Sequence, residues 1–332
     1  MTPWVSVSTG AGLNVLLTGA TGFVGGGVLL RLCAEPGVRV RIAVRRPPDE
    51  VPAGVECADI EGLSATQCWD EALRGIDVVI HAAARVPVIG ERASDPLAAF
   101  RAVNVDATRH LARQAAAAGV KRFVYVSSIK VNGEETEPGQ PYRADYAARP
   151  QDPYGQSKLE AEQALFAIAG ETGLEVVVVR SPLVYGPGVK ANFASLMGAL
   201  QRRLPLPFAA IDNRRSLVAR DNLVDLLLLC ARHPEAAGRV FLVSDGQDLS
   251  TTQLCRELSE ALGVRPRLLP VPALALRALG VLTGRGQQVQ RLLGSLQVDI
   301  SATRRILDWQ PPVPVKQAIR ETAEWYRECR GQ

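Results

Sequence analysis

The chain has 332 residues, of which 47% are hydrophobic and 22% are charged, with a formal net charge of +4. This length is enough to bury a full core, and the composition is that of a soluble globular protein. Because the charge is small and no long basic run occurs, nucleic acid is excluded as the default partner.

The six cysteines are scattered and form no CxxC pair. This argues against a zinc site and a disulfide framework, so we expect no metal and a reducing, cytoplasmic compartment. Residues 1–12 lack the features of a signal peptide and are interpreted as a loose leader. No apolar run reaches the roughly 18 residues of a transmembrane segment. The nearest, residues 268–284, contains prolines and Arg277; we expect it to pack against the core, with a surface helix or weak membrane contact as alternatives.

Short β-branched runs alternate with helix-like segments in the first half of the chain. These runs are residues 13–19, 38–45, 77–83, 122–128 and 174–180. The helix-like segment 96–119 ends on a glycine, as helices often do. The alternation predicts an α/β fold with a Rossmann-type, doubly wound parallel sheet over residues 13–182. Proline and glycine become frequent afterwards, which indicates a smaller C-terminal substrate-binding lobe over 183–332, with 239–245 returning to the sheet.

A glycine-rich turn follows the first predicted strand, with Gly19, Gly22 and Gly25 at GxxGxxG spacing. Such a turn lets the backbone approach a pyrophosphate, whose charge then lies at a helix N-terminus. A tight turn with close helix packing is the structural alternative. The position of the turn, directly after a strand and before an apolar helix, favours dinucleotide binding.

Two arginines, Arg45 and Arg46, end the second predicted strand. An acidic residue at this place binds the ribose 2′-hydroxyl of NAD, whereas arginine accommodates the 2′-phosphate of NADP. The sequence therefore favours NADP(H) over NAD(H), the alternative being that both side chains are only solvated.

Tyr154 stands four residues before Lys158, a spacing that places both on one face of a helix. An ammonium close to a phenol lowers the pKa of the phenol, which suits general acid–base catalysis. Ser128 ends the strand 122–128, at the edge where active sites of open α/β sheets gather, and its hydroxyl can stabilise developing charge. The structural alternatives are a helix-surface pair for the tyrosine and lysine, and a strand-end cap for the serine.

Taken together, the motifs resemble the extended branch of the short-chain dehydrogenase/reductase superfamily, the NAD(P)-dependent epimerase/dehydratase family. The resemblance covers about residues 13–328 and rests on GATGFVG, Asp59-Ile60, HAAA at 81–84, NVDAT at 104–108, YVSS at 125–128, YxxxK and RSPLVYGPG at 180–188. It implies that Ser128, Tyr154 and Lys158 are catalytic. Tyr154 would exchange a proton with the substrate oxygen while hydride moves to or from the nicotinamide, and Lys158 would also bond the nicotinamide ribose.

The same resemblance implies the cofactor contacts, in which Asp59 meets the adenine amino group. The implied set is Gly19, Thr21, Gly22, Phe23, Val24, Gly25, Arg45, Arg46, Asp59, Ile60, Ala82, Ala83, Ala84, Tyr154 and Lys158. Asn104 resembles a helix asparagine of the family, for which a structural role is at least as good an explanation as a catalytic one.

Three residues of the C-terminal half are implied to bind a UDP-sugar substrate. Arg215 would grip the diphosphate or its ribose, Asn192 would contact the phosphates, and Arg291 is a candidate for a second phosphate contact. The sequence departs from the family pattern at Ala219-Arg220, where an aromatic residue or histidine and then an aliphatic residue are common. Two later stretches, residues 241–254 and 291–312, look like those of a subgroup of enzymes. Members of this subgroup reduce UDP-4-keto-6-deoxy-N-acetylhexosamine in surface-polysaccharide synthesis.

The function predicted from the sequence is an NADP(H)-dependent nucleotide-sugar 4-ketoreductase. Ile129 and Lys130 replace the acidic pair of the family's dehydratases, so dehydration is not expected, and the arginines at 45 and 46 favour net reduction. The alternative enzyme is a UDP-hexose 4-epimerase with tightly held NAD. A non-catalytic NADP-sensing or scaffold protein is the alternative of another class, which the intact Ser-Tyr-Lys set disfavours. The oligomeric state is left open, a homodimer included.

Overall fold

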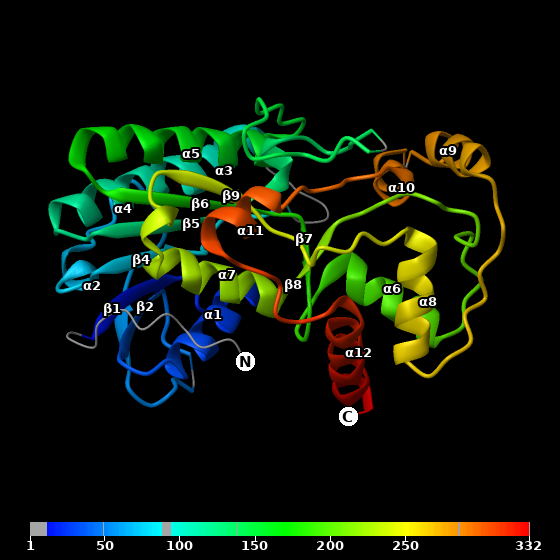
Figure 1. Ribbon diagram of the computed structural model, residues 1–332, viewed down its shortest axis with the longest axis horizontal. Helices are drawn as coiled ribbons and strands as arrows, with labels where there is room; N and C mark the ends of the chain where they lie inside the picture. The colour runs from blue at the N-terminus through cyan, green and yellow to red at the C-terminus, as the bar shows by residue number, and fades with distance from the viewer. Residues whose placement is uncertain (1–11, 49, 88–93, 138, 285, 332) are drawn as a thin grey trace. The chain divides into compact units, whose positions relative to one another are not determined.

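A computed structural model describes residues 12–48, 50–87, 94–137, 139–284 and 286–331 (Figure 1). The loose leader predicted for residues 1–12 therefore lies, except for Gly12, outside the described residues. No helix of the described part is both long enough and apolar enough to cross a membrane.

The main element is a seven-stranded sheet in the order β3-β2-β1-β4-β5-β6-β9. The strands are β1 Leu13–Thr18, β2 Val38–Val44, β3 Val55–Asp59, β4 Val78–His81, β5 Arg122–Ser128, β6 Glu175–Ser181, β7 Leu183–Tyr185, β8 Leu217–Ala219 and β9 Arg239–Leu242. The described pairings from β3 to β5 are parallel, and β7 and β8 form a separate parallel pair. This confirms the doubly wound fold, including the predicted return of the segment at 239 to the sheet.

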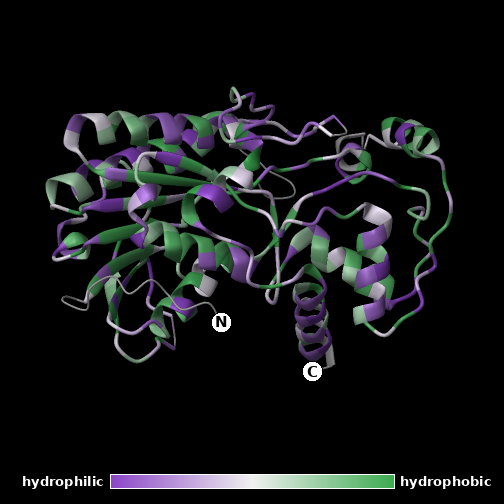
Figure 2. Ribbon diagram, in the orientation of Figure 1, coloured by the Kyte–Doolittle hydropathy of each residue, from purple (hydrophilic) through white to green (hydrophobic). Residues whose placement is uncertain are grey.

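Helices connect most of these strands up to β9, and in the described part of the chain five more follow β9. The helices are α1 Phe23–Cys33, α2 Asp70–Leu73, α3 Pro96–Arg101, α4 Ala107–Ala117, α5 Pro153–Thr172, α6 Ala191–Gln201, α7 Arg220–Arg232, α8 Thr251–Ala261, α9 Ala273–Leu282, α10 Gly286–Leu293, α11 Ser301–Leu307 and α12 Val315–Gly331. Figure 1 shows α4 on one side of the first strands and α1 on the other. The inner strands β1, β4, β5 and β6 are mostly buried and hydrophobic (Figure 2): Val15, Leu16 and Leu17 of β1 have no exposed surface.

Two compact units interleave along the chain. The first holds residues up to 126, then 160–178 and 227–239; the second holds 127–159, 179–226 and 240–332. The first unit contains β1 to β4 and their connecting helices, and the second contains the catalytic residues predicted from the sequence. The domain boundary predicted near residue 182 stays a prediction.

The helix predicted over 96–119 is present but is not continuous. A π-helical turn, Ala102–Asp106, separates α3 from α4 and carries Asn104. The Asn104 side chain is buried; its Oδ1 accepts from the Arg85 backbone N–H at 2.8 Å and its Nδ2 donates to the Arg85 carbonyl at 3.0 Å. Asn104 therefore fixes the loop after β4, which favours the structural role that the sequence left open.

The prediction that residues 268–284 pack against the core is wrong for most of α9. Only Leu276 and Gly280 of this helix are buried, whereas Leu274, Val281 and Leu282 are 78%, 75% and 84% exposed. The physical reason is that α9 packs along one side only. A Cβ at Gly280 would lie 2.8 Å from Val289 of α10, so the two helices are in close contact along that side.

Candidate active site

The glycine turn after β1 is held in a shape that its glycines make possible. Gly19 has φ +76°, and a Cβ on it would lie 2.7 Å from the Ala83 nitrogen. A Cβ on Gly25 would lie 2.0 Å from the Gly19 carbonyl oxygen, so the first turn of α1 packs directly on the loop. The N-cap of α1 is Gly22, which has no side chain to cover the helix N-terminus. The turn thus has the close packing of the structural alternative and also fits a pyrophosphate at the helix start.

Buried histidine hydrogen bonds hold the carboxyl ends of β1 and β4 together. His81 Nδ1 lies 2.7 Å from Thr18 Oγ1, and its Nε2 lies 3.0 Å from Thr108 Oγ1 of α4. The Thr18 hydroxyl also accepts from the Ala83 N–H at 3.3 Å. These bonds explain the HAAA motif: His81 fixes the strand ends, so that residues 82–84 leave the sheet beside the glycine turn.

The other predicted cofactor residues of the first unit lie at the same edge of the sheet. The register pairs Val44 with Asp59, and the Ile60 N–H donates to the Val44 carbonyl at 2.9 Å. Arg45 and Asp59 therefore follow or end neighbouring strands, and the side chains of Arg45, Arg46 and Asp59 are exposed while Ile60 is buried. Thr21 is exposed in the glycine turn, and Phe23 and Val24 are half-buried in the first turn of α1. All of them lie at the carboxyl edge of the strands β1 to β3, the edge at which open α/β sheets bind ligands.

The catalytic set predicted from the sequence lies in the second unit. Ser128 ends β5, and its Oγ accepts from the Lys130 N–H at 3.3 Å, so it also has the strand-end capping role. Tyr154 and Lys158 lie on α5, with Lys158 Nζ 5.9 Å from the centre of the Tyr154 ring. Lys158 is only 2% exposed and Tyr154 is half-buried. The helix thus places the phenol and the ammonium on one face, as the spacing predicts; their catalytic roles stay predictions.

The expected lowering of the Tyr154 pKa is not what this arrangement produces. Burial raises the pKa of Tyr154 above its ordinary value, and the nearby Asp152 carboxylate raises it further. A buried phenolate loses its hydration, and this cost is the larger of the two causes. Tyr154 is therefore a phenol at neutral pH, ready to donate a proton, and it acts as a base only where a cation favours its ionised form.

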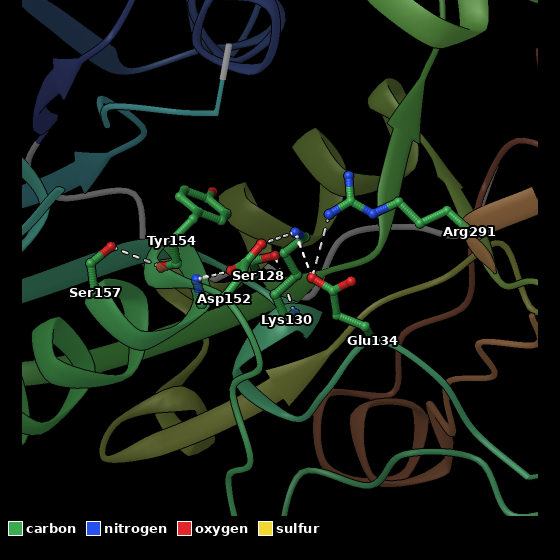
Figure 3. A network of polar contacts seen from close by, with 8 residues as sticks. Ser128, Lys130, Glu134, Asp152, Tyr154, Ser157 and Arg291 are labelled. Atoms are coloured by element: carbon green, nitrogen blue, oxygen red, sulfur yellow. Dashed lines mark hydrogen bonds and ion pairs between the residues drawn. The ribbon is translucent and has the colours of Figure 1, made fainter. Parts of the chain in front are cut away.

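A carboxylate and ammonium cluster supports the start of α5 (Figure 3). Lys130 Nζ donates to Glu134 Oε1 at 2.9 Å and also pairs with Asp152 Oδ2. Asp152 Oδ1 accepts from the Gly155 N–H at 2.6 Å, which caps the helix that carries Tyr154. Burial acts to raise the pKa of Asp152, but the hydrogen bonds from Lys130 and Gly155 outweigh it and keep that pKa below its usual value.

This cluster is the part of the site that the sequence analysis missed. Asp152 directly before Pro153 is a helix-start signal, and Lys130 and Glu134 have the i,i+4 spacing of an ion pair, so both signals were present. A Cβ on Gly155 would lie 2.7 Å from the Lys130 carbonyl oxygen. Glycine at 155 therefore lets α5 approach the segment after β5 closely, and this brings Tyr154 toward the end of that strand.

Of the three predicted substrate residues, the structure brings two together. Arg291 Nη2 lies 3.6 Å from Glu134 Oε1, and Arg215 Nη1 donates to the Gly294 carbonyl at 2.9 Å. Burial lowers the pKa of Arg215; the charge of Glu135 partly opposes this lowering, and the charge of Arg291 adds to it. These charged groups are therefore neighbours. Asn192 is exposed in the first turn of α6. None of the contacts described for the second unit joins it to the two arginines.

What this fold and these motifs define is the extended short-chain dehydrogenase/reductase class, and the protein is an NAD(P)-dependent enzyme of that class. Within it, the chain belongs to the NAD dependent epimerase/dehydratase family, which matches residues 15–244.

Individual relatives support this assignment over nearly the whole chain. A UDP-glucose 4-epimerase of Vibrio cholerae is 43% identical over 320 residues, covering 96% of this chain and 97% of the relative. The solved structure of MoeE5 in complex with UDP-glucose and NAD is 26% identical, with a TM-score of 0.74 over 95% of this chain and 99% of that one. UDP-glucuronic acid 4-epimerase from Bacillus cereus, in complex with NAD, shares the fold with a TM-score of 0.76 at 17% identity, over 95% and 99% of the two chains.

Proposed function

We propose that the protein is a UDP-hexose 4-epimerase that holds NAD through its cycle. The observation that carries this proposal is the 43% identity to the Vibrio cholerae UDP-glucose 4-epimerase, because it extends over 96% of this chain. This identity supports the epimerase, which was the alternative in the sequence analysis, better than the 4-ketoreductase.

The groups on α5 suit this reaction. Bound NAD would supply a hydride acceptor and donor for the sugar, so the redox change would be internal. Tyr154 takes the proton from the substrate hydroxyl in one half of the cycle and gives it back in the other. Because burial favours the protonated form of Tyr154, Lys158 would be the cation of this chain that favours the phenolate in the first half. The Ser128 hydroxyl donates to the same substrate oxygen.

The arginines of the second unit suit a diphosphate. Arg215 and Arg291 are close enough to influence each other's charge, and guanidinium groups make bidentate, charge-assisted bonds to phosphate oxygens. Glu134, which pairs with both Arg291 and Lys130, links this pair of arginines to the segment after Ser128. Binding of the diphosphate by these arginines would hold the nucleotide end of the substrate in place and leave the hexose free to change its orientation.

A second candidate is the NADP(H)-dependent 4-ketoreductase acting on a UDP-4-keto-6-deoxy-N-acetylhexosamine. One observation favours it: Arg45 and Arg46 are both exposed after β2, where a 2′-phosphate would need cations. In that reaction the protonated state of Tyr154 is the active one, since the phenol donates to the new hydroxyl.

The deciding experiment incubates purified enzyme with UDP-galactose and no added cofactor, and follows UDP-glucose by chromatography. An epimerase equilibrates the two sugars with no net change in the absorbance of reduced nicotinamide. A matched reaction supplies UDP-4-keto-6-deoxy-N-acetylglucosamine and NADPH. Stoichiometric NADPH oxidation there, without interconversion of UDP-hexoses in the first reaction, would reject the epimerase in favour of the reductase.

A further inference from the structure

Exposed apolar side chains gather on one segment of the second unit. Among the described residues, eleven large hydrophobic side chains are exposed, and six of them fall between residues 269 and 292. We call these six the apolar patch: Leu269, Leu274, Leu279, Val281, Leu282 and Leu292. Single exposed leucines are ordinary on a soluble protein, but such a concentration on one segment indicates a surface that contacts something else.

The helix α9 carries apolar residues on two faces. Leu276 and Gly280, at i and i+4, form the buried face; Leu276 packs in a small cluster with Ile211 and Leu293. Positions 274, 278, 281 and 282 have the i, i+4, i+7, i+8 spacing of a second apolar stripe, on the side away from that cluster. Leu274, Val281 and Leu282 in this stripe are 75% exposed or more. Figure 2 shows the mostly hydrophobic colour of α9.

The charges carried by the segment itself are of one sign, whereas beside α10 Glu134 pairs with Arg291 at 3.6 Å and Glu135 accepts from Gln290 Nε2 at 3.0 Å. From residue 261 to residue 298 the sequence holds five arginines and no aspartate or glutamate. Arg265, Arg267 and Arg277 are exposed, and Arg277 lies on α9 itself. An apolar stripe bordered by arginines complements a surface that offers hydrocarbon beneath anionic phosphates. A second copy of this chain fits less well, because a two-fold contact through the patch would bring arginine toward arginine.

The length of the helix decides how it would meet such a surface. Ten residues of α-helix extend over about 15 Å, roughly half of the hydrocarbon thickness of a bilayer. We propose that α9 and its flanking residues dock on an anionic lipid membrane, with the helix in the interface plane and the stripe at 274, 278, 281 and 282 in the acyl boundary. This inference is independent of the substrate and of the direction of the reaction.

The test measures co-sedimentation of the whole enzyme with vesicles of phosphatidylcholine and phosphatidylglycerol in a 7:3 ratio, and with phosphatidylcholine alone. We expect the wild type to pellet with the anionic vesicles and to be released by added salt. Leu274→Ser with Leu282→Ser should weaken this partitioning at least about tenfold. Arg277→Gln should weaken it about fivefold on anionic vesicles only, since it removes one charge near the surface.

The matched control is Leu30→Ser with Leu204→Ser, which removes two exposed leucines outside the patch. It should bind vesicles like the wild type. Wild-type enzyme that stays in the supernatant with anionic vesicles, or equal losses in both double variants, would overturn the proposal. Sedimentation velocity gives the other outcome: a wild-type dimer that only Leu274→Ser with Leu282→Ser dissociates would make the patch a subunit interface. If the double variant Leu274→Ser with Leu282→Ser misfolds, the single variant Arg277→Glu provides the test. We expect it to lose binding to anionic vesicles, and unchanged binding would overturn the proposal.

Discussion

The ammonium nitrogen of Lys158 lies 5.9 Å from the centre of the Tyr154 ring, within the helix α5. The i,i+4 spacing brings the two side chains to one face, and the lysine is almost completely buried there. Burying a cation costs free energy, which a pair of surface side chains would not have to overcome. A buried ammonium beside a phenol is, however, an arrangement that suits proton transfer.

Replacing Tyr154 with phenylalanine should remove the proton donor and leave the fold and cofactor binding intact. Turnover of the UDP-sugar should fall by roughly 10²–10⁴-fold, as is typical for the loss of a general acid or base. Initial rates check the first part and a titration with NAD(H) the second. Tyr146→Phe, at an exposed tyrosine, is the control. Near-wild-type turnover of Tyr154→Phe would remove this residue from the mechanism.

Charge at Asp152 should set the pH dependence of Tyr154. Because the carboxylate adds to the raised pKa of Tyr154, Asp152→Asn should lower that pKa. In the direction that needs the phenolate, the rate rises as pH passes the tyrosine pKa, so this limb of the kcat/KM profile should move to lower pH. Lys130→Met, which leaves the carboxylate without its partner, should move the limb to higher pH. Movement of both variants in the same direction would contradict the assignment.

The cap at Asp152 can be separated from its charge, because asparagine caps a helix as well as aspartate does. Asp152→Ala loses the hydrogen bond to the Gly155 N–H, so it should lower the free energy of unfolding by about 1 kcal/mol. Asp152→Asn should lose much less. Urea denaturation of both variants measures the difference, and equal losses would show that the ion pair with Lys130, rather than the cap, holds the start of α5.

Two glycines of α5 should respond to alanine in opposite ways. At Gly155 a Cβ would lie 2.7 Å from the Lys130 carbonyl oxygen, so Gly155→Ala should cost about 1–3 kcal/mol through overcrowding and should also lower turnover. At Gly170 a Cβ would meet nothing within 4 Å, so Gly170→Ala should stabilise the helix by up to about 1 kcal/mol. Thermal unfolding midpoints check both. A Gly155→Ala enzyme as stable as the wild type would mean that α5 does not pack tightly against the Lys130 carbonyl.

The second candidate function, the NADP(H)-dependent 4-ketoreductase, makes cofactor preference depend on the two arginines after β2. Replacing Arg45 and Arg46 with alanine should weaken NADPH far more than NADH, because only NADPH carries a 2′-phosphate for them to pair with. Fluorescence titrations of both cofactors measure this. Arg39→Ala, at the other end of the same strand, is the control. Equal losses for the two cofactors, or a wild-type preference for NADH, would leave the arginines as surface charge and support the NAD-holding epimerase.

Arg215 should control binding of the nucleotide. Arg215→Ala should raise the KM for a UDP-sugar, with kcat less affected if the contact is uniform between ground and transition states. Calorimetric titration of UDP into the wild type, Arg215→Ala and the exposed neighbour variant Arg214→Ala checks this. No UDP binding to the wild type would reject the nucleotide-sugar substrate. Equal binding to all three would leave that substrate standing and move the phosphate grip to Arg291.

The sequence by itself determined the sheet, the glycine turn and the tyrosine-lysine pair, because each depends on residues that are close along the chain. A β-branched run, a turn that needs glycine and a spacing of four on a helix are local properties, and several of them in order define the family. The same holds for the end of the helix at Gly119, where φ is +81°.

Only the tertiary structure decided what surrounds those motifs. Lys130 and Asp152 are 22 residues apart, and they meet because Gly155 lets α5 approach the segment after β5. Burial, the larger cause of the raised pKa of Tyr154, also depends on packing and not on spacing. Burial decided the surface of α9 as well. Its residues are apolar on both faces, and only the position of its neighbours determines which face is covered and which remains exposed.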